Sequence, residues 1–117
     1  MKHTEEDLQQ TCVRWFELQH HNIAMLLHHS PNGGKRSARE GARFKKMGTR
    51  AGFPDLFLYL PVGGFHGLAI EMKTDKGRQQ PTQKAWQQQL EEHGYVYKLC
   101  RSFDSFREII DEYLQAK

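Results

Sequence analysis

Residues 54–73 read PDLFLYLPVGGFHGLAIEMK and contain the strongest structural signal in the chain. Two apolar runs in this stretch, 56–60 and 67–73, are typical of β-strands. The first run is nearly all apolar, as expected for a central strand that is covered on both faces. Pro61 and the glycine pair at 63–64 end the first run. Because the connection is short, we expect the two strands to pair as a hairpin.

Three charged side chains flank these apolar runs. Asp55 directly follows Pro54 at the start of the first strand, and Glu71 and Lys73 lie two residues apart near the end of the second. Successive side chains point to opposite faces of a strand, so Glu71 and Lys73 share one face. If the strands pair, Asp55 approaches Glu71, and two carboxylates converge beside an ammonium group.

Converging carboxylates can bind Mg²⁺, which prefers oxygen ligands and retains several waters and room for a phosphate. Such an ion polarises a phosphoryl oxygen and lowers the pKa of a bound water. Lys73 is suited to orient that water or to offset negative charge in the transition state, and the Met72 backbone carbonyl is a further candidate ligand. The competing interpretation is that Asp55 is a turn acceptor and Glu71 and Lys73 are a solvated ion pair.

The rest of the chain predicts a single α/β domain over residues 1–117. A capping pattern at Thr4 and Asp7 begins the first helix, and Asn22 ends it. The expected order is α-β-α-β-β-α-β-α, a small mixed β-sheet flanked by helices. The other elements are a strand at 23–27, a helix between 37 and 47, a helix from Pro81 to about 93, a strand at 95–100 and a helix after Ser102.

Positive charge is concentrated between residues 35 and 50. The whole chain has a net charge of +3, whereas this segment contains seven basic residues and one acidic residue. We expect it to contact the phosphate backbone of DNA, although a solvated helix face is the simpler alternative. Asn32, in the turn before it, either brings backbone amides to a phosphate or only forms the turn. The basic residues are Lys35, Arg36, Arg39, Arg43, Lys45, Lys46 and Arg50.

Composition excludes several other classes of protein. The chain has a mean hydropathy of −0.78 and lacks an apolar run of the roughly 20 residues that cross a bilayer. Its first residues are polar, so we expect no signal peptide, no membrane association and a cytoplasmic location. Cys12 and Cys100 match no metal or redox spacing and are expected to be buried thiols. The pairs His20-His21 and His28-His29 are expected on the surface rather than in a zinc site.

These motifs resemble a known family of nucleases. Pro54-Asp55 followed by Glu71-Met72-Lys73 resembles the PD-(D/E)XK signature, and nearly the whole chain resembles the virus-type replication-repair nuclease (VRR-NUC) domain of the stand-alone phage and bacterial type. The supporting residues are Glu5, Leu8-Gln9, Trp15, Pro31-Asn32-Gly33-Gly34, Lys46-Met47-Gly48, Gly52-Phe53-Pro54-Asp55-Leu56, Glu71-Met72-Lys73-Thr74, Gly77, Pro81, Gln83 and Trp86.

The resemblance implies a restriction-endonuclease-like core and an activity. Such domains are Mg²⁺- or Mn²⁺-dependent endonucleases, and stand-alone members resemble homodimeric enzymes that cleave branched DNA such as Holliday junctions in replication, recombination or repair. In a bacterium or a phage-infected cell, such a protein works in the cytoplasm. Two alternatives remain: a non-catalytic DNA-binding accessory protein with a nuclease-like fold, and a module whose basic face binds an acidic protein.

The resemblance also assigns residue roles. Asp55 and Glu71 correspond to metal ligands, Lys73 to the catalytic lysine, Glu5 to the acid of the first helix that completes the metal site, and Gln83 to the glutamine of the later helix. Glu6 with Gln10 has the same spacing as Glu5 with Gln9, so both registers remain open. The chain departs from the family at Gln79-Gln80, where an apolar residue and a capping serine are usual before the helix.

Overall fold

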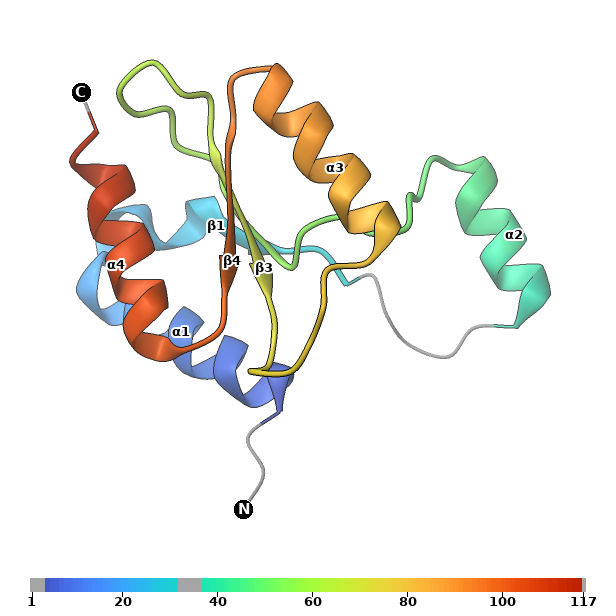
Figure 1. Cartoon of the computed structure of the whole chain (residues 1–117), viewed down its shortest axis with the longest axis horizontal. Coiled ribbons are helices and arrows are strands. Elements are labelled where there is room, and N and C mark those ends of the chain that lie inside the picture. Colours follow the sequence, from blue (N-terminus) through green and yellow to red (C-terminus); the bar gives the residue numbers. More distant parts are fainter. Residues whose placement is uncertain (1–3, 32–36, 117) are drawn as a thin grey trace.

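A four-stranded mixed sheet forms the centre of the protein (Figure 1). The computed structural model describes residues 4–31 and 37–116. The strands lie in the order β1-β2-β3-β4; β1–β2 and β2–β3 are antiparallel and β3–β4 is parallel. The predicted hairpin is therefore confirmed. The strands are β1 (Leu27–His29), β2 (Leu56–Leu58), β3 (Leu68–Met72) and β4 (Val96–Cys100).

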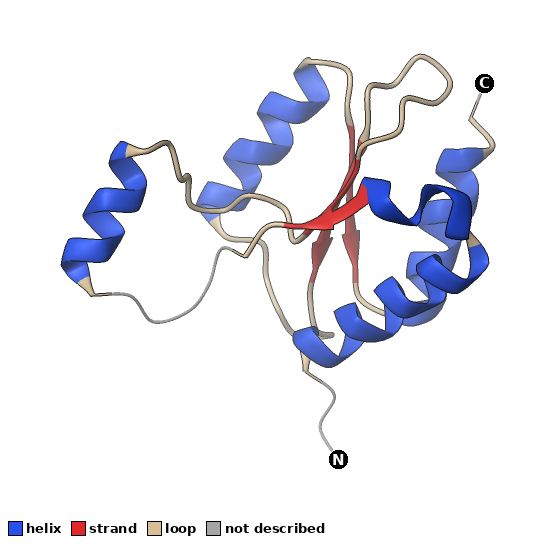
Figure 2. Ribbon diagram, turned by 180° about the vertical axis from the view of Figure 1, so that it is seen from behind, coloured by secondary structure: helices blue, strands red, loops and turns tan. Residues whose placement is uncertain are grey.

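Helices cover both faces of this sheet (Figure 2). Helices α1 (Glu5–Gln19) and α4 (Phe103–Leu114) lie on one face, and α3 (Pro81–Glu92) lies on the other. The larger core contains Phe16 of α1 and Phe106 of α4, both fully buried. The fold is thus the mixed α/β architecture that the sequence predicts.

Side chains alternate along β3 as expected for a buried strand. Leu68, Ile70 and Met72 belong to the core under α1 and α4, whereas Ala69 belongs to the smaller core under α3. Glu71 continues the row of Ala69 and is buried with it. Side chains alternate between the two faces of β3, and this alternation forms both cores. It therefore also determines the direction of Glu71 and of Lys73, which is the next residue on the same face.

The prediction of a strand at 23–27 is wrong. Residues His21–Leu26 form a 3₁₀-helix, η1, and the strand begins only at Leu27. A 3₁₀-helix has three residues per turn, so Ile23 and Leu26 lie on the same side, and both pack against the larger core. An apolar run of this length fits either a strand or a helical turn, and the core contacts decide between them.

Helix α2 (Ala38–Lys46) stands apart from the rest of the molecule (Figures 1 and 2). Ser37 caps it by accepting a hydrogen bond from the Glu40 amide at 3.1 Å. Its residues are exposed or half-buried, and the Arg43 guanidinium lies over the Phe44 ring at 5.4 Å from its centroid. The few apolar residues of this helix therefore do not join the core. Within the described part of the chain, no helix combines the length and apolarity needed to cross a membrane.

The segment between α2 and β2 is fixed against α3. The Trp86 indole N–H donates to the Ala51 carbonyl at 3.0 Å, and the Trp86 and Phe53 rings meet edge to face at 4.8 Å. Gly52 has φ +83°, and a Cβ there would lie 2.7 Å from backbone and side-chain atoms of Thr82. Only glycine tolerates both that backbone conformation and such a close approach. These contacts hold the chain that leads directly into Asp55.

We expect Gly52→Ala to be much more destabilising than Gly64→Ala. Both glycines have positive φ, but a Cβ at Gly64 would meet no atom within 4 Å. The conformational cost alone is about 1 kcal/mol, and overlap with the Thr82 backbone adds about 1–3 kcal/mol at Gly52. Urea unfolding of the two variants measures this difference. Equal losses of stability in the two variants would show that the packing of α3 does not require the close approach of Gly52 to Thr82.

Candidate active site

Asp55 and Met72 join the start of β2 to the end of β3. Asp55 Oδ2 accepts a hydrogen bond from the Met72 amide at 2.8 Å. Leu56 pairs with Ile70, so the antiparallel register continues to Asp55 and Glu71. The two carboxylates that the sequence predicts to converge are therefore neighbours. An N–H and a C=O of one residue leave a strand on the same side, so the Met72 carbonyl is also directed toward β2.

Glu71 is a buried carboxylate. Its side chain is 2% exposed, and Oε1 has no hydrogen-bond partner among the described residues. Burial, followed by the hydrogen bond and charge of Asp55, raises the pKa of Glu71 from 4.5 to about 9, while Lys73 opposes this shift. Without a further cation, the carboxyl is neutral at pH 7. A buried carboxylate of this kind needs a counter-charge to ionise.

Lys73 lies beside this pair of acids. It continues the face of Glu71, and its amide donates to the Cys100 carbonyl at 2.9 Å, which extends the pairing of β3 with β4 by one residue. Its side chain is only 7% exposed. The structure therefore brings together all three residues of the sequence motif at one edge of the sheet.

The beginning of α1 faces the same edge. The charge of Glu5 contributes to the raised pKa of Glu71, whereas Glu6 accepts a hydrogen bond from the Gln10 side chain at 3.4 Å. These contacts favour Glu5 over Glu6 as the acid that faces the site. A pocket between α1 and the sheet is lined by Glu5, Glu6, Gln9, Gln10, His29, Pro31 and Asp55.

His29 is a site residue that the sequence prediction missed. Its Nδ1 lies 2.7 Å from the Asp55 carbonyl oxygen, and because that oxygen only accepts, Nδ1 carries the proton. The bond holds the backbone of Asp55 from the β1 side. Only the pairing of β1 with β2 brings His29 and Asp55 together, and no local sequence pattern predicts that pairing.

Gln83 caps its own helix. Its Oε1 accepts a hydrogen bond from the Gln80 amide at 2.7 Å, so the start of α3 is stabilised without the usual serine. Gln79 is also bonded, because its side-chain amide donates to the Tyr97 hydroxyl at 3.2 Å. The catalytic role of Gln83 stays a prediction.

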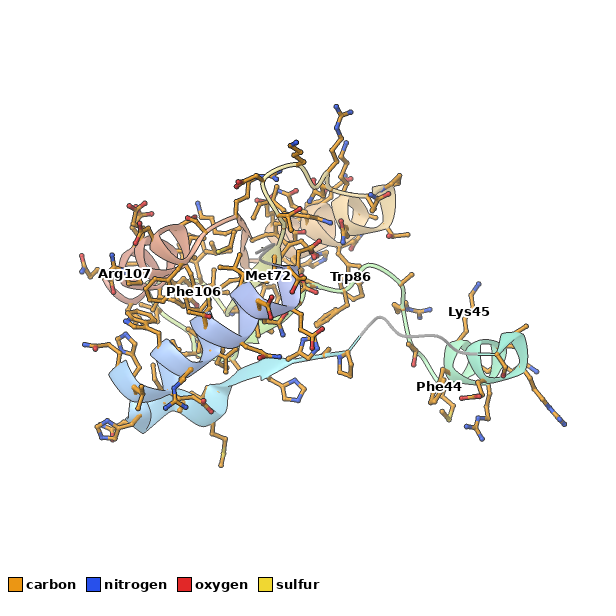
Figure 3. All side chains as sticks on the ribbon, turned by 90° about the horizontal axis from the view of Figure 1, so that it is seen from below. Phe44, Lys45, Met72, Trp86, Phe106 and Arg107 are labelled. Atoms are coloured by element: carbon orange, nitrogen blue, oxygen red, sulfur yellow. The ribbon has the colours of Figure 1, made fainter. Side chains whose placement is uncertain are left out.

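The basic residues of α2 lie away from the acidic site. Helix α2, seen in Figure 3 with Lys45 and Phe44, is separated from the part of the protein that contains Met72 and Trp86. Asn32, Lys35 and Arg36 fall outside the described residues. The basic side chains on α2 and just after it are all exposed: Arg39, Arg43, Lys45, Lys46 and Arg50.

The acidic edge of the sheet, formed by Asp55 and Glu71 with Glu5 of α1 facing it, suits a divalent cation that keeps part of its water shell. Within residues 4–31 and 37–116, no three His, Cys, Asp or Glu side chains form a ready-made metal site. The buried Glu71 Oε1 nevertheless has no hydrogen-bond partner in the described part of the chain, and Glu71 lies next to Asp55. Two carboxylates and a backbone carbonyl are the kind of ligand set that Mg²⁺ uses together with water, so these residues fit such an ion.

This fold is consistent with a PD-(D/E)XK nuclease core, in which an acid precedes one strand and a Glu-x-Lys motif ends the next. Residues 3–104 match the VRR-NUC domain, and the chain belongs to this nuclease family. A solved structure described as a VRR_NUC domain protein has a TM-score of 0.86 and 30% sequence identity to this chain, over 98% of this chain and 91% of that one. A search of curated proteins found no match.

Replacing Glu71 with glutamine should stabilise the metal-free protein at alkaline pH. The pKa of Glu71 is raised in the folded state to about 9 from 4.5, so the folded protein retains a proton that the unfolded chain loses. The free energy of unfolding therefore falls as pH rises between these two values, and Glu71→Gln removes this loss. We expect a gain of roughly several kcal/mol at pH 8 and of less than about 1 kcal/mol at pH 5.

Urea unfolding in EDTA at both pH values measures the effect. Glu108→Gln is the matched control, because Glu108 is exposed on α4. A Glu71→Gln protein with the same pH dependence as the wild type would contradict the burial argument.

Proposed function

We propose that this protein is a Mg²⁺- or Mn²⁺-dependent endonuclease that hydrolyses phosphodiester bonds in branched DNA, such as Holliday junctions, during replication, recombination or repair. The observation that carries this proposal is the buried Glu71 carboxylate between Asp55 and Lys73, whose Oε1 has no hydrogen-bond partner among the described residues. A buried carboxylate oxygen without a partner is costly. Binding of a divalent cation would offset the cost of burying this oxygen. The resemblance to the nuclease family implies that hydrolysis of phosphodiester bonds requires such a cation.

The proposed ligands come from three parts of the chain. Asp55, Glu71 and the Met72 carbonyl hold the ion at the edge of the sheet, and Glu5 completes the site from α1. A divalent ion held by these residues would supply Lewis-acid polarisation of the scissile phosphate and a more acidic water. His29 keeps the Asp55 backbone in place through its hydrogen bond to the carbonyl.

Lys73 acts directly on the reacting groups in this mechanism. Its ammonium donates hydrogen bonds that hold the attacking water or neutralise charge that develops on the phosphate. Burial of the side chain limits the positions that this ammonium adopts. Gln83 lies on the following helix and is the further polar residue that the family assigns to the site.

The basic segment provides the proposed DNA contacts. Arg39 and Arg43 are four residues apart on α2 and therefore lie on one face of it, and the exposed cations beside them add to the attraction for phosphates. Asn32, Lys35 and Arg36, which precede α2 in the sequence, are proposed as further DNA contacts. A homodimer of such domains would offer two sites to the two strands of a branched substrate.

Lys73→Ala should abolish most DNA cleavage without weakening DNA binding. We expect the single-turnover rate on a labelled four-way junction in Mg²⁺ or Mn²⁺ to fall about 100-fold or more, as for loss of other transition-state charge partners. The dissociation constant measured in Ca²⁺ should stay within about twofold, because phosphate contacts elsewhere dominate affinity. Lys98→Ala, at an exposed lysine on β4, is the control and should cleave normally.

The substrate panel also includes a flap and a linear duplex. If the wild type cleaves none of the three DNAs with either metal, the nuclease proposal fails. Binding that survives EDTA and is unaffected by Lys73→Ala, in the absence of cleavage, would instead identify an accessory DNA-binding protein. The absence of any salt-dependent DNA binding would favour a protein partner.

Loss of two charges on α2 should weaken DNA binding without destabilising the fold. We expect Arg39→Gln with Arg43→Gln to reduce the slope of log affinity against log salt by about 2, one for each phosphate contact. The melting temperature should change little, because the Arg39 and Arg43 side chains are exposed. A double variant of two other exposed arginines, Arg14→Gln with Arg107→Gln, is the control; equal losses of affinity in both would contradict a specific role for α2.

A further inference from the structure

The Arg101 side chain donates hydrogen bonds to backbone carbonyls of the 74–77 loop, which is distant in the sequence. It follows β4 directly, and its Nη1 lies 2.7 Å from the Thr74 oxygen and 2.8 Å from the Gly77 oxygen. The Asp75 oxygen is 3.5 Å away. The two short contacts account for both hydrogens of this nitrogen. The cation is therefore engaged with the main chain of the 74–77 loop.

That loop packs on the side chain of Lys73. The Gly77 amide donates to the Thr74 carbonyl at 3.0 Å, which closes a tight turn. A Cβ at Gly77 would lie 3.4 Å from Lys73 Cδ and 3.3 Å from Thr74 Oγ1. The backbone of the turn thus lies against the aliphatic stem of the lysine, whose side chain is only 7% exposed.

The parallel pairing of β3 and β4 explains why these groups meet. Met72 pairs with Cys100, and the Lys73 amide donates to the Cys100 carbonyl at 2.9 Å. Lys73 and Arg101 therefore leave the ends of adjacent strands at the same edge of the sheet. The main chain of Lys73 is held by β4, and the turn over its side chain is held by Arg101.

We propose that Arg101 is a positioning residue for Lys73. Its hydrogen bonds keep the 74–77 loop closed over the lysine stem, so that the ammonium stays beside Glu71 rather than sampling solvent. A lysine side chain has four flexible carbons, and confinement of a reacting group contributes directly to rate. The effect on rate rests on the proposed nuclease function, whereas the closure of the loop does not.

Hydrogen exchange followed by mass spectrometry tests the closure of the loop. In Arg101→Gln, we expect the Gly77 amide, which donates to the Thr74 carbonyl in the closed turn, to exchange about tenfold faster or more, as for loss of a hydrogen bond to a charged donor. Exchange in α4 should be unchanged. Arg101→Lys should restore part of the protection, since an ammonium also donates to carbonyls. Arg107→Gln, on the exposed face of α4, is the control and should leave the loop unchanged.

Cleavage and binding assays test the consequence for Lys73. We expect Arg101→Gln to lower the single-turnover cleavage rate about tenfold or more, with the dissociation constant for the same DNA in Ca²⁺ within about twofold. A loss of affinity that Arg101→Lys restores, with an unchanged rate for bound DNA, would instead make Arg101 a phosphate contact and overturn the inference.

Two other results overturn it. The first is a Gly77 amide whose exchange rate is unchanged in Arg101→Gln, and the second is a Gly77 amide that exchanges faster while the cleavage rate is unchanged. If the wild type does not cleave DNA, the proposed function fails by itself. The exchange measurement then still decides whether Arg101 holds the loop over Lys73.

Discussion

The hydrogen bond between the Asp55 carboxylate and the Met72 amide organises the acidic edge of the sheet. It forms where the main-chain pairing of β2 with β3 ends, and it satisfies a buried amide with a side chain instead of a strand partner. This bond places one carboxylate next to Glu71, which is buried in the adjoining row of side chains. Loss of Asp55 would leave both an unpaired buried amide and a different charge environment for Glu71.

The alternation of side chains along β3 determines both the composition of the hydrophobic core and the direction of the site residues. Leu68, Ile70 and Met72 are buried under α1 and α4, and the strand period then sends Glu71 to the opposite face. A slip of one residue between β2 and β3 would turn the charged row into the larger core and move the apolar row to the face under α3. The same apolar contacts that stabilise the fold therefore maintain the direction of the acid and the lysine.

Sequence patterns predict the features that depend on neighbours within one or two elements. The alternation along 67–73 predicts the common face of Glu71 and Lys73, and the short connection predicts their approach to Asp55. His29 and Arg101 were missed because their partners lie 26 and 24–27 residues away in the sequence. Those contacts exist only once β1 pairs with β2 and β3 pairs with β4.

The parallel pairing of β3 and β4 separates the two ends of the sheet. A parallel pair needs a crossover, here the chain through α3, and the crossover returns to the sheet at the opposite end of β4. Lys73 and Arg101 meet because the two strands end at the same edge, whatever length of chain joins them. The end of the sheet near Gly94, where the His66 amide donates to the Gly94 carbonyl at 2.8 Å, is therefore held by contacts of its own, separate from those at the acidic edge.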